Sequence, residues 1–181
     1  MGKTETDMNL FGRDLSGAEF SSCGKYRYKL LRIWDESKPL AMCIGLNPST
    51  ANSEKNDTTI RYLIQMLGIL GYGGFYMMNL FAIISSKPDV LLTCDDPLGE
   101  NDSKLNEVAQ LCDDIIFCWG NFKQARDRIK EVAPRFPGAK CFGVNANGTP
   151  FHPLAMMPRN GRDPNSPKLF YFETTMKLLK G

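Results

Sequence analysis

Five short apolar stretches of the chain are predicted to form β-strands. The first, 26–35, alternates apolar and polar positions and contains aromatic residues, which is typical of a half-buried strand. The other four are nearly continuous apolar runs at 39–46, 74–80, 115–120 and 139–144. Runs of this length and composition favour strands that are buried on both faces of a parallel sheet.

Segments with helical spacing alternate with these strands. Thr58–Leu70 places apolar residues at positions 60, 63, 64, 67 and 70, which form one stripe along a helix. Asp57 or Thr58 is expected to cap its start, and Gly71 to end it. Three further helices are expected at 103–112, at 121–133 with Asn121 as a plausible cap, and at 168–180.

The alternation of strands and helices predicts an α/β fold. We expect a three-layer sandwich around a central, mostly parallel, four-stranded sheet. Residues 1–22 show little periodicity and are expected to form a loose N-terminal leader, so the folded unit would be a single domain over 23–181. A length of 181 residues suits one domain.

Polar signatures follow the buried strands at the edge where parallel sheets bind ligands, the carboxyl ends of their strands. GLNPST ends the first of the four apolar runs, MMNLFA the second and CWGN the third. The fourth leads into a loop with the only histidine of the sequence, His152. We therefore expect Asn47, Asn79, Gly120–Asn121 and His152 to line one edge of one sheet.

Each of these residues also has a purely structural interpretation when taken alone. The Asn47–Thr50 segment is typical of a turn or a helix start, Asn79 of a turn cap, and Asp57 of a helix N-cap. Taken together, two amides and one histidine predict a pocket rich in hydrogen-bonding groups, which suits a planar ligand such as a nucleobase. A neutral histidine can donate to an oxygen that gains negative charge. Asn47 can position a water molecule but is a poor base.

Charge and composition narrow the function classes. With 22 basic and 20 acidic residues the net charge is +2, which is not the strong excess of a protein that coats nucleic acid but leaves room for a local basic groove. Six cysteines without a C-x-x-C pair are expected to be free thiols, with no metal cluster and no cofactor. The polar start of the chain and the lack of an apolar run of about 18 residues predict a cytoplasmic protein without a membrane span. We expect a monomer.

The order and spacing of these signatures resemble the uracil-DNA glycosylase superfamily. GLNPS at 45–49 is similar to its first motif, in the Asn form of the mismatch-specific uracil/thymine branch. The segment 74–81 resembles the strand whose terminal Asn pairs with the flipped base, and 115–126 resembles a strand-to-helix segment with a WG pair. FHPLAMMP at 151–158 resembles the second catalytic loop. The chain as a whole also resembles a bacterial and phage family of unknown function that shares the GLNPST, NLFA, WG and HP signatures.

The resemblance implies a DNA base-excision N-glycosylase that acts on a flipped, modified or mismatched base. It implies that Asn47 orients the attacking water, that Asn79 reads the base edge, and that His152 stabilises the departing base anion. The other implied substrate-binding residues are Gly45, Leu46, Pro48, Ser49, Phe81 and Gly120. The implied DNA contacts are Thr50, Lys87 and Arg159, with Leu154, Met156 or Met157 as the wedge and with Ser85, Ser86, Arg162 and Lys168 near phosphates.

The sequence departs from this superfamily at two motifs. Ser49–Thr50 replaces the His or Tyr that follows the proline in the uracil-excising branch, and the loop after His152 lacks that branch's serines, so the resemblance does not extend to uracil specificity. Asp57 would supply the missing carboxylate if the loop 50–57 folds back over the pocket. Two alternatives remain open: an N-glycosidase or other hydrolase of free nucleosides or nucleotides, and a non-catalytic nucleic-acid-binding module with the same fold.

Overall fold

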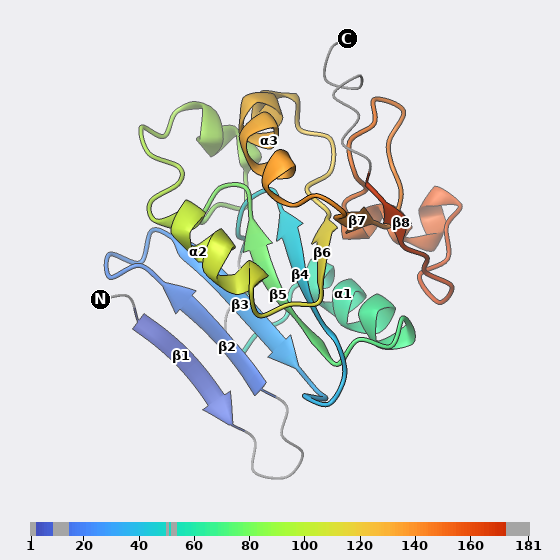
Figure 1. Ribbon diagram of the computed structural model, residues 1–181. Coiled ribbons are helices and arrows are strands. Elements are labelled where there is room, and N and C mark those ends of the chain that lie inside the picture. The colour runs from blue at the N-terminus through green and yellow to red at the C-terminus, as the bar shows by residue number, and fades with distance from the viewer. Residues whose placement is uncertain (1–2, 9–14, 50, 52–53, 173–181) are drawn as a thin grey trace.

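The computed structural model describes residues 3–8, 15–49, 51 and 54–172, whose strands form one mixed sheet (Figure 1). The order of the eight described strands is β1-β2-β3-β5-β4-β6-β7-β8. Their bounds are β1 (Lys3–Met8), β2 (Leu15–Phe20), β3 (Arg27–Ile33), β4 (Leu40–Gly45), β5 (Gly74–Asn79), β6 (Asp114–Phe117), β7 (Lys140–Cys141) and β8 (Phe170–Tyr171).

The four apolar runs form the parallel centre of this sheet. β5, β4, β6 and β7 are neighbours and pair in parallel, whereas β1, β2 and β3 join antiparallel at one side and β8 at the other. The fold is therefore α/β as predicted, but the prediction of a four-stranded, mostly parallel sheet is wrong. Only strands covered on both faces show continuous apolar runs, so the sequence pattern indicated β3 by its alternation but did not reveal β1, β2 or β8.

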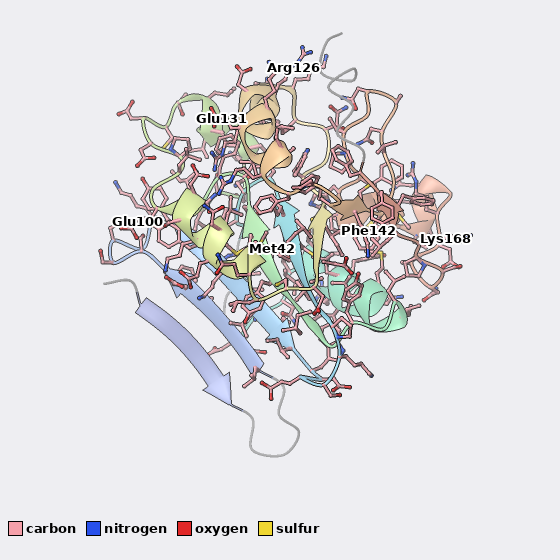
Figure 2. All side chains as sticks on the ribbon, in the orientation of Figure 1. Met42, Glu100, Arg126, Glu131, Phe142 and Lys168 are labelled. Carbon is pink, nitrogen blue, oxygen red and sulfur yellow. The ribbon has the colours of Figure 1, made fainter. Side chains whose placement is uncertain are left out.

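Helices cover both faces of the central strands (Figure 1). Along β4, Ala41 and Cys43 pack into the cluster beneath α1 (Thr58–Ile69), because successive side chains of a strand point to opposite faces. Met42, labelled in Figure 2, and Ile44 pack into the cluster beneath α2 (Asn101–Ala109) and α3 (Arg126–Val132). Each face of the sheet thus has its own apolar core.

Helix α1 starts at the predicted residue with one of the two predicted caps, and it ends one residue earlier than predicted, at Ile69. Asp57 is the N-cap, and its Oδ1 accepts a hydrogen bond from the Ile60 N–H at 2.9 Å. The buried side chains of the helix are Ile60, Leu63, Met66 and Leu67, all on the stripe that faces the sheet. Gly71 follows the helix with a φ of +87°, a conformation that glycine adopts without strain.

The first strands of the chain contradict the expected loose leader. β2 pairs with β3 over its whole length, and β1 pairs with β2. Glu19 on β2 forms ion pairs with Lys29 (3.0 Å) and Lys104 (2.7 Å), which tie this strand to β3 and α2. The fold therefore starts before residue 23. β2 is held by the hydrogen bonds of the sheet and by ion pairs. It needs no apolar run, so the sequence pattern did not reveal it.

Later elements differ from the predictions in length and type. The helix expected at 121–133 begins as a 3₁₀ turn at Lys123–Ala125 and continues as α3, and Asn121 caps neither. The strand expected at 139–144 is reduced to β7. Within the helix expected at 168–180, Phe170–Tyr171 form β8, and 173–180 lie outside the described residues. Further 3₁₀ turns are η1 (Pro88–Leu92), η3 (Ala133–Arg135), η4 (Pro153–Met156) and η5 (Pro158–Asn160).

Candidate functional site

A cavity of about 230 Å³ lies at the carboxyl edge of the parallel strands. Gly45–Asn47 line it from the end of β4, Asn79 from the end of β5, and Trp119 from the segment after β6. His152 lines it from the loop before η4. The volume is below the range of roughly 300–1,000 Å³ for drug-sized ligands, so it suits a single base rather than a dinucleotide. The structure thus brings Asn47, Asn79 and His152 together, as the strand pattern predicts.

Asn79 presents an unused amide to this cavity. Its side chain is only 1% exposed, and neither Oδ1 nor Nδ2 has a hydrogen-bond partner in the described structure. The backbone beneath it is held by Asn101, whose Nδ2 donates to the Asn79 carbonyl at 2.8 Å. A Cβ atom at Gly45 would lie 2.8 Å from Asn79 Oδ1, so the glycine leaves space for the amide. A buried amide without a partner costs about 1–3 kcal/mol, which a ligand with a matching edge would offset.

Arg27 also lines the cavity, although the sequence pattern did not reveal it. It is 3% exposed, its Nη1 donates to the Ala51 carbonyl, and its Nε has no partner in the described structure. Burial lowers the pKa of Arg27 to about 10, with the charge of Asp57 acting in the opposite direction, so the guanidinium stays charged at neutral pH.

The topology explains why Arg27 lies here. β3 runs antiparallel to β5, so the first residue of β3 lies at the edge where β5 ends, and the arrowheads in Figure 1 show the opposite directions. The Arg27 N–H donates to the carbonyl of Ala82, just beyond β5, at 2.9 Å. The strand at 26–35 is predictable from its pattern, but its direction is not.

Trp119 contributes an indole donor to the same cavity. Its side chain is 2% exposed and its Nε1 has no hydrogen-bond partner in the described structure. The ring packs on Phe117 with the centroids 4.4 Å apart. In the WG signature, the resemblance implies that Gly120 binds the substrate. The structure instead has Trp119, the other residue of the pair, in the cavity lining.

Asn47 is oriented by its own amide donors. Its Nδ2 donates to the carbonyls of Pro48 at 3.1 Å and Ser85 at 2.9 Å. Oδ1 is therefore the atom that remains to accept a hydrogen bond from a ligand or a water molecule. This geometry suits the positioning of water and supplies no strong base.

Asp57 caps α1 and also lies at the cavity. It caps α1 through Oδ1, while Oδ2 accepts a hydrogen bond from the Ser49 hydroxyl at 2.6 Å. Asp57 and Ser49 both line the cavity, so the segment before α1 returns to it. The carboxylate raises the pKa of both Arg27 and His152, although in each case burial has the larger, opposite effect.

His152 is held in one tautomer. Its Nδ1 accepts a hydrogen bond from the Leu154 N–H at 3.2 Å, which leaves Nε2 to carry the proton. Burial lowers the pKa of His152, so the ring is neutral at pH 7 and donates through Nε2. Gly120 has a φ of +77°, and a Cβ there would lie 3.2 Å from His152 Cβ. Gly120 therefore permits the close approach of the two loops.

The loop around His152 is braced from both sides. Phe151 packs against Gly143, where a Cβ would lie 2.6 Å from its ring. The Arg162 guanidinium lies over the other side of the loop, 4.0 Å from the Phe151 ring centroid, and donates to the Ala155 carbonyl at 3.0 Å. Arg162 thus contributes to the rigidity of the loop.

The remaining predicted residues differ in where they lie relative to the cavity. Leu46, Ser49, Ser85 and Ser86 line the cavity. Pro48, Phe81 and Gly120 do not line it; Phe81 packs against the core under α2 and α3. Met156 is buried in the core under α1, which contradicts its expected role as a wedge, whereas Leu154 and Met157 are half-buried. Lys87, Arg159 and Lys168 are exposed, and Figure 2 shows Lys168 at the outer edge of the molecule. Thr50 lies outside the described residues.

The comparisons place the chain in a family. Residues 27–154 match the model of a family described as a protein of unknown function (DUF1643), and the chain therefore belongs to that family. The matched range contains the cavity residues from Arg27 to His152. No curated protein and no solved structure matches the chain. Within the described ranges, none of the helices is long and apolar enough to cross a membrane, and no His, Cys, Asp and Glu side chains gather in threes as metal ligands would.

Proposed function

We propose that this member of the DUF1643 family is a DNA base-excision N-glycosylase with a uracil-DNA glycosylase-like sandwich fold. The observation that supports this most is the Asn79 amide, which is buried and unpartnered in a cavity of about 230 Å³. The edge of a nucleobase offers adjacent acceptor and donor atoms, which pair with an amide in two hydrogen bonds.

The cavity residues divide the reaction between them. Asn79 holds the base, and His152 donates from Nε2 to a base oxygen that becomes negative as the glycosidic bond breaks. Asn47 accepts a hydrogen bond from a water molecule through Oδ1 and orients it toward C1′. Since the amide is a poor base, the base departs before the water attacks. The products are a deoxyribose with a hydroxyl at C1′ and the free base, which takes up the proton lost by the water.

The wall around His152 supplies the contacts with DNA. Leu154 and Met157 are half-buried on the same loop and fill the space that the flipped nucleotide leaves in the duplex. Unstacking the base costs a few kcal/mol, and an apolar wedge offsets part of this cost. The exposed cations Lys87 and Arg159 contact phosphates.

A second candidate is a hydrolase of free nucleotides. The net charge of +2 favours it, because enzymes that act on duplex DNA commonly have a larger basic excess. This candidate predicts turnover of mononucleotides and weak DNA affinity that changes little with salt. A non-catalytic binding module instead predicts salt-dependent DNA binding without an abasic product.

The test is a glycosylase assay with labelled oligonucleotides that carry uracil, mismatched thymine, hypoxanthine, 5-hydroxymethyl bases or larger modified pyrimidines. Treatment with alkali converts abasic sites to strand breaks. We expect cleavage at one of these bases by the wild type and none by His152→Ala or Asn79→Leu, while Asn165→Leu, a change of the same kind at an exposed site, retains activity. Absence of cleavage at every base contradicts the proposal, and mononucleotide turnover and a salt titration then separate the two alternatives.

A further inference from the structure

The charge of Arg27 is only partly balanced by the described residues around it. Among the described residues Arg27 forms no ion pair, and the acid that acts on it, Asp57, already accepts hydrogen bonds from Ser49 and Ile60. Its Nε lacks a partner while the side chain is 97% buried. A buried cation that no anion compensates is costly, so proteins commonly pair it or use it to bind a ligand.

The hydrogen-bonding groups of the cavity also favour a negatively charged ligand, because free donors outnumber free acceptors. Among the described cavity residues, the buried atoms without partners are three donors, Arg27 Nε, Trp119 Nε1 and Asn79 Nδ2, and one acceptor, Asn79 Oδ1. Asn47 Oδ1 is a second acceptor that faces the ligand, because the hydrogen bonds of that amide use Nδ2. His152 adds a fourth donor through Nε2, because Nδ1 is occupied. A ligand that satisfies these groups has more acceptors than donors and carries negative charge. Exocyclic amines, as on cytosine or adenine, would add donors where the cavity already has them.

We propose that the cavity binds its ligand as an anionic planar ring and that Arg27 is a catalytic residue, which neutralises the charge on the departing base. This inference rests on the proposed N-glycosylase function. It adds a cation from the antiparallel strand β3 to the roles of Asn47, Asn79 and His152, and it narrows the substrate class to bases that leave as stabilised anions.

The charge changes in the reaction fit this role. When the bond between C1′ and the base nitrogen breaks, its electron pair passes to the base, whose ring oxygens share the negative charge. A neutral His152 can donate a hydrogen bond to this anion but adds no positive charge. The Arg27 guanidinium supplies the charge, and because it is already in place it requires no reorganisation when the bond breaks. Water then forms the new bond to C1′, and its proton passes to the base.

The test measures binding of free bases by calorimetry. The probes are barbiturate, a planar trioxopyrimidine that is an anion at neutral pH, and uracil, a neutral ring of similar shape. We expect the wild type to prefer barbiturate by at least about tenfold, and Arg27→Gln to lose about 10- to 100-fold of barbiturate affinity with little change for uracil. Arg27→Lys, which keeps the charge but not the planar fork, is expected to retain a preference for barbiturate.

Arg32→Gln is the matched control, because Arg32 is on the same strand and 5% exposed but does not line the cavity. It is expected to bind both probes as the wild type does. Equal affinity of the wild type for the two probes, or a preference that persists in Arg27→Gln, would overturn the inference, as would failure to bind either probe.

Failure of the inference and failure of the proposed function give different results. Oligonucleotide cleavage that is unchanged in Arg27→Gln would refute the catalytic role of Arg27 and leave the N-glycosylase function in place. Barbiturate binding that depends on Arg27, in a protein that cleaves no oligonucleotide, would establish the anion site and refute the function.

Discussion

A pair of glycine-to-alanine substitutions tests the packing of the cavity wall without knowledge of the substrate. At Gly45 a Cβ would lie 2.5 Å from Met77 Cε and 2.8 Å from Asn79 Oδ1, well inside normal contact distance. The Met77 methyl group is the flexible end of its chain and can move aside. The Asn79 amide is 1% exposed and lies in the cavity wall, so a Cβ at Gly45 displaces it from its present position. We expect Gly45→Ala to lower the free energy of unfolding by about 1–3 kcal/mol, the usual cost of overpacking a core.

Gly68→Ala provides the matched control. Gly68 is exposed on α1, and a Cβ there would meet nothing within 4 Å. Alanine is the better helix former, so we expect a gain of up to about 1 kcal/mol. Urea unfolding followed by circular dichroism measures both variants, and an unchanged m-value shows that the midpoints report stability. Heat unfolding provides a second measure, with a shift of about 2–4 °C per kcal/mol for a chain of this size.

The two effects have opposite signs, which makes the comparison decisive. Gly45→Ala is also expected to weaken ligand binding, because the displaced amide no longer presents both of its atoms, whereas Gly68→Ala is expected to bind as the wild type does. A Gly45→Ala protein that is as stable as the wild type and binds ligand equally well would refute the geometry derived for Gly45 and Asn79.

Three further predictions follow from the site. Asp57→Ala removes the cap of α1 and is expected to cost about 0.5–2 kcal/mol by urea unfolding, whereas Asp57→Asn keeps the cap and most of the stability; equal losses would argue against capping. Because burial lowers the pKa of His152 below its ordinary 6.5, the unfolded chain binds its proton first, so stability is expected to fall as the pH decreases through 6.5 toward the folded value. Heat unfolding from pH 8 to 5 measures this loss, which His152→Gln is expected to reduce; an identical pH dependence in this variant would exclude His152 as the source. Met156→Ala is expected to cost about 2–5 kcal/mol because the side chain is in the core, and the half-buried Leu154→Ala much less, which the same urea assay compares; the reverse order would contradict their placement.

The central strands and α1 were predictable because their signals are local. The apolar runs of β4 and β5 mark strands covered on both sides, and the stripe of α1 follows an aspartate whose side chain accepts the expected cap bond. Asn47 and Asn79 could be assigned to one edge because parallel strands end at the same side of a sheet. These inferences need only the order of elements and the pleat of a strand.

The contribution of Arg27 was not predictable, because it depends on the direction of β3. A strand that enters antiparallel brings its first residue, rather than its last, to the edge where the cavity lies. The same limit applies to β2, which is held by pairing and by the ion pairs of Glu19 rather than by an apolar run. Met156 illustrates a third limit: its place in an exposed-looking loop does not show that its side chain turns into the core.

The unpartnered polar atoms of the cavity have a consequence for the evolution of this family. The unpartnered amide of Asn79 weakens the empty fold by about 1–3 kcal/mol, so replacement of Asn79 by leucine, which has a similar volume, is expected to make the chain more stable. Stability alone therefore favours an apolar residue at this position, and under the proposed function selection for the ligand opposes it. In a lineage without the proposed activity, Arg27 and Asn79 are expected to drift first, while the core of α1 stays unchanged. The amino acids at these two positions thus report whether a given relative still uses its cavity.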